Sequence, residues 1–161
     1  MTDVTIGPVD RMVWHDDELK ALCSPYLAVG YRSEKPRLTD VRRTETGVAG
    51  DFAVADGEVD SLGVYHLSAV TALVVASQLI VVGVHIDQEL RRKSGEVFLH
   101  DISLRCRRQV NVRDGSCELD FVRRRKTAHG MYYKVSCSVE SGAFVGTASV
   151  LHSLPGAATG S

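Results

Sequence analysis

The sequence predicts an α+β domain in which a curved, mostly antiparallel sheet wraps around one long apolar helix. Three observations lead to this prediction. The chain has 161 residues, 44% of them hydrophobic and 24% charged, which is typical of one globular domain with a full core. The long segment 63–84 contains no Asp, Glu, Lys or Arg. Segments of alternating apolar and polar residues, the pattern of half-buried strands, stand before and after it.

The first part of the chain is predicted to contain little regular structure. Residues 1–13 are expected to form a loose lead-in. A short helix is predicted over Trp14–Cys23, because Asp16 and Asp17 suit its first turn and Pro25 stops it soon afterwards.

One or two strands are predicted over residues 37–54. Val48, Phe52 and Val54 alternate with polar or small residues, so they indicate one buried face. Gly47 is expected to mark a turn between the two halves.

The segment 63–84 is predicted to be a fully buried core helix. About 20 apolar residues can also span a bilayer. Its polar residues argue against a membrane span, because a helix that faces lipid does not need them. These residues are His66, Ser68, Thr71, Ser77 and Gln78. Its flanks have no aromatic belt, and the strands that follow need a core to wrap.

Four strands are predicted after the helix, over Gly95–Val110, Cys117–Lys126, Met131–Glu140 and Ala143–Leu154. The first is expected to break near Asp101. Asp-Gly within Arg113–Ser116 predicts a tight hairpin, because this dipeptide adopts positive φ readily. Short connections predict an antiparallel four-strand meander. The domain is expected to cover residues 1–154, with a disordered tail over 155–161.

The cysteines predict neither disulfides nor a metal site. Cys23, Cys106, Cys117 and Cys137 form no C-x-x-C pair and have no zinc spacing. The last three lie in the apolar register of predicted strands, so we expect buried free thiols that pack as small hydrophobic groups.

Charge and the amino terminus point to a cytoplasmic protein that does not bind nucleic acid. The formal net charge is -1. Bulk attraction to nucleic acid is therefore not expected. The amino terminus lacks the basic start and apolar core of a secretory signal, so a cytoplasmic location is expected.

Two short motifs resemble one family of acyl-thioester enzymes. His66–Val70 and Ser77–Leu79 are similar to the pattern His, any residue, Asn, Ala, Val, then Asn-Gln-Leu. This pattern belongs to the FcoT-like long-chain fatty acyl-CoA thioesterases, which have the hotdog fold. Ser24–Tyr26 and Gly50–Phe52 also look similar, and the resemblance covers roughly residues 24–154. Serine replaces both family asparagines, and Asp60 falls near the position of a family tyrosine.

The resemblance implies a hotdog fold, a homodimer or higher homo-oligomer, and a thioester bound at the amino end of the central helix across the dimer interface. Backbone N–H groups there can polarise a carbonyl. Many relatives carry a carboxylate one to two turns along the helix, whereas this helix has none. Val74 occupies the position where hotdog dehydratases commonly carry glutamate, so dehydration is disfavoured.

The candidate catalytic residues are Asp60, His66, Ser68, Ser77 and Gln78. An imidazole with a pKa of about 6.5 can exchange a proton at neutral pH. Four of them also have a structural alternative. His66 could bond to backbone, Ser68 could bond back to its own helix, and Asp60 could cap the helix. Gln78 could be a core amide across the dimer.

The candidate substrate-binding residues are Tyr65, Thr71, Arg105, Arg107 and Arg124. The arginines, with the basic run Arg123–Lys126, could bind the phosphates of coenzyme A or of phosphopantetheine, or meet the acidic helix of an acyl carrier protein. The alternative is a solvated sheet face. Thr71 could equally bond back to its own helix.

The sequence therefore predicts an enzyme acting on a fatty acyl-CoA or acyl-carrier-protein thioester, most simply a thioesterase. One alternative is a lyase-type enzyme that adds an amine or water to an α,β-unsaturated acyl thioester. The other is a non-catalytic acyl-binding protein. No metal or organic cofactor is expected.

Overall fold

The computed structural model describes residues 34–153 except 58 and 61. Several predictions fall outside these described residues: the lead-in, the short helix over Trp14–Cys23, Cys23 itself, the Ser24–Tyr26 similarity and the tail.

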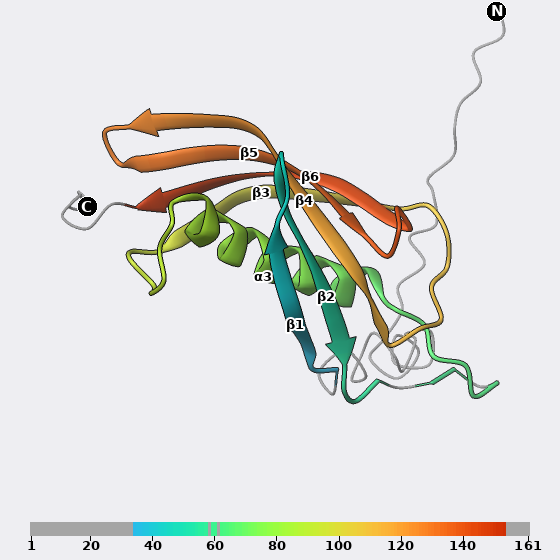
Figure 1. The fold of residues 1–161 in the computed structure, drawn as a ribbon. Coiled ribbons are helices and arrows are strands. Elements are labelled where there is room, and N and C mark those ends of the chain that lie inside the picture. Colours follow the sequence, from blue (N-terminus) through green and yellow to red (C-terminus); the bar gives the residue numbers. More distant parts are fainter. Residues whose placement is uncertain (1–33, 58, 61, 154–161) are drawn as a thin grey trace, which may run out of the picture.

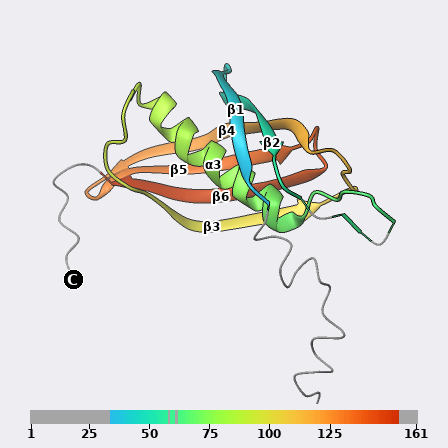
Figure 2. The same cartoon turned by 90° about the horizontal axis from the view of Figure 1, so that it is seen from below.

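The described chain forms one antiparallel sheet and one helix. The elements are β1 (Pro36–Arg43), β2 (Gly47–Val54), α3 (Ala69–Asp87), β3 (Val97–Cys106), β4 (Asp114–Thr127), β5 (Gly130–Val139) and β6 (Phe144–Ser153). The six strands follow the order β1-β2-β4-β5-β6-β3. Figures 1 and 2 show the sheet curving around α3, with β1 and β2 at one side of the helix. The predicted α+β fold class is confirmed.

The predicted four-strand meander is wrong at its first strand. β3 pairs with β6 at the edge of the sheet, and only β4, β5 and β6 form a meander. Asp114 and Gly115 make no hairpin turn but open β4, where they pair with Ala53 and Phe52 of β2. A Cβ on Gly115 would lie 2.8 Å from the Phe52 ring. The glycine is therefore required by close packing between β2 and β4, which a dipeptide motif does not reveal.

Two smaller predictions about the strands are confirmed. The pairing of β3 with β6 shifts register between Leu99 and Asp101, which is the predicted break. The predicted turn joins β1 to β2, and Gly47 closes it as the first residue of β2, with its carbonyl accepting from the Thr44 N–H at 3.0 Å. A Cβ on Gly47 would collide with the Leu119 carbonyl of the neighbouring strand. This glycine too is selected by a close approach.

The helix begins later than predicted because Ser68 caps it. The Ser68 hydroxyl accepts a hydrogen bond from the Thr71 N–H at 2.8 Å, so α3 starts at Ala69 and runs to Asp87. The preceding residues form an extended segment, in which the Leu67 N–H donates to the Val110 carbonyl at 2.8 Å. His66 therefore stands just ahead of the helix and not within it.

Among the described residues, the burial of α3 is confined to one side of the helix. The buried helix residues are Thr71, Ala72, Val75, Ala76, Leu79, Ile80, Gly83 and Val84. On the other side Val70, Val74 and Val81 are each 39% exposed. The prediction of a fully buried helix is therefore wrong for the single chain. By length and mean hydropathy α3 could also cross a membrane, but here it is the core helix of the sheet.

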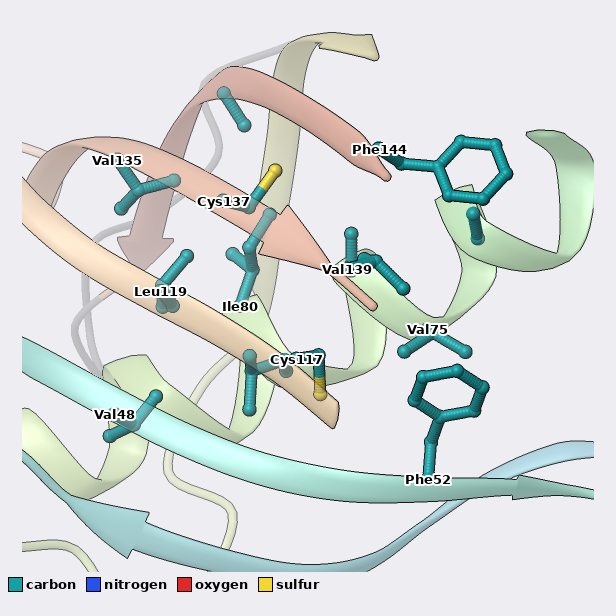
Figure 3. Close-up of a cluster of buried hydrophobic side chains, with 14 of the residues drawn as sticks. Val48, Phe52, Val75, Ile80, Cys117, Leu119, Val135, Cys137, Val139 and Phe144 are labelled. Carbon is teal, nitrogen blue, oxygen red and sulfur yellow. The ribbon is translucent and has the colours of Figure 1, made fainter. Parts of the chain in front are cut away.

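The core lies between α3 and the concave face of the sheet. Figure 3 shows Val75 and Ile80 of the helix facing Phe52 of β2 and Leu119 of β4. Each such buried side chain contributes roughly 1.5–3 kcal/mol through removal of apolar surface from water.

The free cysteines only partly follow the predicted pattern. Cys117 and Cys137 are buried, as predicted, and burial raises the pKa of the Cys117 thiol to about 12. Cys106 is exposed, contrary to the prediction, because it ends the edge strand β3. The alternating pattern of apolar residues therefore predicted burial wrongly at the end of an edge strand, which has a neighbouring strand on one side only.

Candidate functional site

Three segments meet at the amino end of α3. The segment 55–68 leads into the helix, and the segment 107–113 connects β3 to β4. They are joined by the hydrogen bond from Leu67 to Val110. The third segment is the start of β1, where Pro36 pairs with Val54 at the end of β2. The Val54 N–H in turn donates to the Arg113 carbonyl at 2.9 Å. Residues remote in the sequence are thereby brought around one helix terminus.

The centre of this region is a hydrogen bond between His66 and Asp60. The His66 Nε2 and Asp60 Oδ2 atoms are 2.7 Å apart. Asp60 Oδ1 accepts the backbone N–H groups of Leu62 and Val64, at 2.8 and 2.9 Å. Asp60 therefore caps a turn of its own loop. It does not cap α3, which was the structural alternative for this residue. This turn fixes the carboxylate so that its second oxygen meets the imidazole.

The two groups shift each other's proton affinity in opposite directions. The hydrogen bond that His66 donates to the Asp60 carboxylate, with a smaller effect from the Asn111 carbonyl oxygen, raises the pKa of His66 above its ordinary value. The Val64 N–H, followed by His66, lowers the pKa of Asp60. The pair therefore favours imidazolium beside carboxylate, and His66 keeps its proton to higher pH than an isolated histidine.

The other ring nitrogen of His66 faces two amides. Asn111 lies 2.7 Å from Nδ1, and Gln109 Nε2 lies 2.5 Å from it. With the Asn111 NH2 group turned toward the ring, it donates to Nδ1 and also reaches the carbonyls of Val110 and Tyr65. In this arrangement the imidazole is neutral, with its proton on Nε2 toward Asp60; when Nδ1 is protonated as well, the Asn111 carbonyl oxygen faces the ring and accepts from Nδ1–H. Contacts at both ring nitrogens therefore fix the orientation of the His66 imidazole.

Tyr65 and Arg113 form the wall beside this pair. Tyr65 is 6% exposed, and the Arg113 guanidinium carbon lies 4.5 Å from its ring centroid. Arg113 Nη2 also donates to the Gly57 carbonyl at 2.8 Å. Stacking and this hydrogen bond together hold the guanidinium over the Tyr65 ring.

The side chains of Ser68 and Thr71 form hydrogen bonds at the start of α3. Ser68 Oγ accepts the Thr71 N–H and contacts Thr71 Oγ1 at 2.8 Å, and both residues are buried. Their hydroxyl groups shape the amino end of α3. A direct catalytic role for Ser68 and a substrate contact for Thr71 stay predictions.

Ser77 and Gln78 lie farther along the helix, away from His66. Ser77 Oγ donates to the Leu73 carbonyl at 2.8 Å, and Gln78 Nε2 donates to the Pro36 carbonyl of β1 at 3.0 Å. Both side chains line an apolar hollow of about 440 Å³ on the outer side of α3, formed with Leu73, Val74, Val81 and Val82. Within one chain the predicted catalytic residues therefore divide into two groups.

The predicted arginines do not gather at one site. Arg105 and Arg107 are exposed, on β3 and just after it. Arg124 belongs to the other end of α3, where its Nη2 lies 2.8 Å from Asp87 Oδ1 and its guanidinium carbon 4.6 Å from the Phe121 ring centroid. Arg124 is thus tied to the helix end by a forked ion pair.

Sequence reasoning missed the residues that surround His66 from the β3–β4 connection. Gln109 and Asn111 carry no motif, and Arg113 was assigned only to a turn. Nothing in the sequence signalled their proximity, because more than forty residues separate them from His66. Among the described residues, no group of three or more His, Cys, Asp or Glu is placed to hold a metal ion.

Comparison with known proteins supports the fold. No family model matches the chain, and no curated protein matches it. A mutant thioesterase from Pseudomonas aeruginosa has a similar structure, with a TM-score of 0.50, 8% identity, and coverage of 73% of this chain and 81% of the other. A thioesterase from Haemophilus influenzae has a TM-score of 0.48 at 12% identity, covering 87% of this chain and 91% of the other. The six-stranded antiparallel sheet curved around one helix is the hotdog fold, as in the Pseudomonas structure.

Proposed function

We propose that this chain is an acyl-thioester-processing enzyme, most simply a thioesterase for fatty acyl-CoA or acyl-carrier-protein thioesters. The observation that carries the proposal is the His66–Asp60 pair just ahead of the amino end of α3. The thioesterase with the similar fold and the resemblance of the His66–Val70 motif support the same reaction class.

In this proposal the thioester carbonyl lies against the helix start. The first N–H groups of an α-helix have no partner within the helix, and its dipole favours negative charge there. Because Nε2–H is bonded to Asp60, an imidazolium at His66 would donate through Nδ1–H, in place of its contacts with Asn111 and Gln109, to the oxyanion that develops when the carbonyl carbon is attacked. Ser68 would act indirectly, because its side chain sets where α3 begins.

The residues farther along the helix would contact the acyl chain. The hollow beside Ser77 and Gln78 is apolar and lies on the outer side of α3. Gln78 holds the start of β1 through the Pro36 carbonyl. The exposed Arg105 and Arg107 would meet phosphates of the carrier, coenzyme A or phosphopantetheine.

The proposed function is tested by intact-mass spectrometry on saturated and α,β-unsaturated acyl-CoA and acyl-carrier-protein thioesters, with and without glycine. We expect free acid and free thiol from saturated substrates. A gain of mass on unsaturated substrates with the thioester intact would assign conjugate addition instead. Saturable binding without turnover of any substrate would contradict an enzymatic role and indicate an acyl-binding protein.

We also propose that the enzyme is a homodimer in which a second copy covers the outer side of α3. Val70, Val74 and Val81 are partly exposed there, next to the apolar hollow. The edge strand β3 pairs only with β6 in the described chain, and its Phe98 and Leu99 are 46% and 41% exposed. An open edge strand beside an apolar helix face favours association with another chain.

The dimer is tested with Val74→Lys, which places a charge in the middle of the outer helix side. Light scattering is expected to give a dimer for the wild type and a monomer for this variant. Val122→Lys is the matched control, because Val122 is 62% exposed on β4 and lies outside the hollow. A monomeric wild type, or a Val74→Lys variant that stays dimeric, would contradict the proposal.

A further inference from the structure

The side chain of Gln109 contacts His66 and serves no other part of the described chain. Gln109 lies exposed in the β3–β4 connection, and its Nε2 atom is 2.5 Å from Nδ1 of His66 and 3.3 Å from Nε2 of the same ring. Among the described residues the Gln109 amide has no other hydrogen-bond partner. The neighbouring Arg108, by contrast, donates to the Glu140 carbonyl at 2.8 Å and ties the connection to the turn after β5. Gln109 therefore has a place at the candidate site but no structural task in the connection.

Two amide groups meet the same ring nitrogen of His66. Asn111 lies 2.7 Å from Nδ1, and Gln109 also reaches this atom. A ring nitrogen offers one lone pair when neutral and one N–H when protonated, so it can bond well to only one amide at a time. Asn111 suits either state, because its oxygen accepts from Nδ1–H, and its NH2 group, when turned, donates to Nδ1 and reaches the carbonyls of Val110 and Tyr65. Asn111 alone can therefore hold this side of the ring in both states.

Protonation of His66 leaves the Gln109 amide without a partner. Gln109 faces Nδ1 with its nitrogen, which can only donate. An imidazolium carries a hydrogen on Nδ1, so two donors would oppose each other there, while the Asn111 oxygen accepts from the ring. The hydrogen bond to Asp60 favours this protonated state. In the state that acts on substrate, the N–H groups of Gln109 can therefore turn to another acceptor beside Nδ1–H.

We propose that Gln109 is a catalytic residue that donates a second hydrogen bond to the thioester oxygen. The inference rests on the thioesterase function proposed above, in which His66 donates to the same oxygen through Nδ1–H. A carbonyl oxygen has two lone pairs, so one substrate oxygen can accept from both residues. The side chain of Gln109 is exposed, so it can turn aside as this oxygen takes its place at Nδ1. Both hydrogen bonds strengthen as negative charge develops on the oxygen.

The activity test compares Gln109→Ala with the wild type on the thioester that the wild type hydrolyses. The expected loss is roughly 10- to 10²-fold and falls mainly on kcat, because the missing bond is one to a charge that develops in the transition state. Gln109→Glu keeps the length of the side chain but replaces its donors by acceptors, so it should lose at least as much. Val112→Ala is the matched control and should keep its kcat, because Val112 is 46% exposed in the same connection and carries no donor on its side chain.

The titration of His66 provides a readout that does not depend on turnover, and NMR signals of the imidazole, assigned with His66→Ala, follow it. A donor that bonds to the neutral Nδ1 favours the neutral ring, so Gln109→Ala should raise the pKa of His66 further. Asn111→Leu removes an acceptor that raises this pKa and should therefore lower it. A fall in the pKa of His66 in Gln109→Ala would show that the Gln109 oxygen holds the imidazolium, and it would overturn the inference.

The outcomes separate this inference from the proposed function. A wild type that hydrolyses thioesters beside an equally active Gln109→Ala variant would overturn the role of Gln109 and leave the proposed function in place. A wild type that turns over no thioester would overturn both. Loss of kcat in folded Gln109→Ala and Gln109→Glu variants, with Val112→Ala unchanged and the pKa of His66 raised in Gln109→Ala, would establish the inference.

Discussion

Replacing His66 by alanine is expected to lower kcat by about 10²- to 10³-fold, because the developing oxyanion would lose one positioned donor. Steady-state kinetics on the hydrolysed thioester measure this loss. His129→Ala is the matched control, since His129 is exposed in the β4–β5 turn. Full activity of a folded His66→Ala variant would remove His66 from the proposed mechanism.

The same residue determines the alkaline side of the pH profile. His66 acts as imidazolium, so activity should fall as pH rises through its pKa, which Asp60 raises above 6.5. Asp60→Asn removes the largest cause of that rise, and the falling limb should therefore move to lower pH. If the limb kept its position in Asp60→Asn, it would belong to another group.

Leu79→Ala is expected to destabilise the fold by about 2–5 kcal/mol, the range found when a large core side chain is removed and leaves a cavity. Leu79 is 0% exposed at the middle of the buried side of α3. Chemical denaturation at fixed protein concentration measures the change. Leu62→Ala is the control, because Leu62 is 84% exposed in the loop before the helix. A loss below 1 kcal/mol in Leu79→Ala would mean that the helix does not pack against the sheet as described.

The fold class could be predicted because it depends on local patterns. The charge-free stretch and the alternation of residues such as Val48 and Phe52 record which surfaces are buried, and the structure places these two residues in the core. Strand order was predicted less well. The Asp114-Gly115 dipeptide favours a turn by its own propensity, but pairing with Phe52 of β2 overrides that propensity.

The candidate site was predictable only in part. His66 was identified from its motif and Asp60 from its position near the helix, and the structure brings their side chains together. The structure makes Ser68 the cap of α3, not a helix residue that bonds back to its own helix, and it bonds Ser77 to the Leu73 carbonyl. Gln109 and Asn111 were not identified, because neither stands in a motif.

The sequence by itself determined an antiparallel α+β fold around one apolar helix and the two residues of the His66–Asp60 pair. Periodicity and a short motif act over a few residues, so they can be read without knowing which segments meet. Only the tertiary structure decided that β3 lies at the sheet edge, that one side of α3 stays uncovered, and that Gln109 and Asn111 meet His66. These features depend on strand pairing and burial between distant segments. The free energy of such contacts is gained only when the sheet and the helix have assembled.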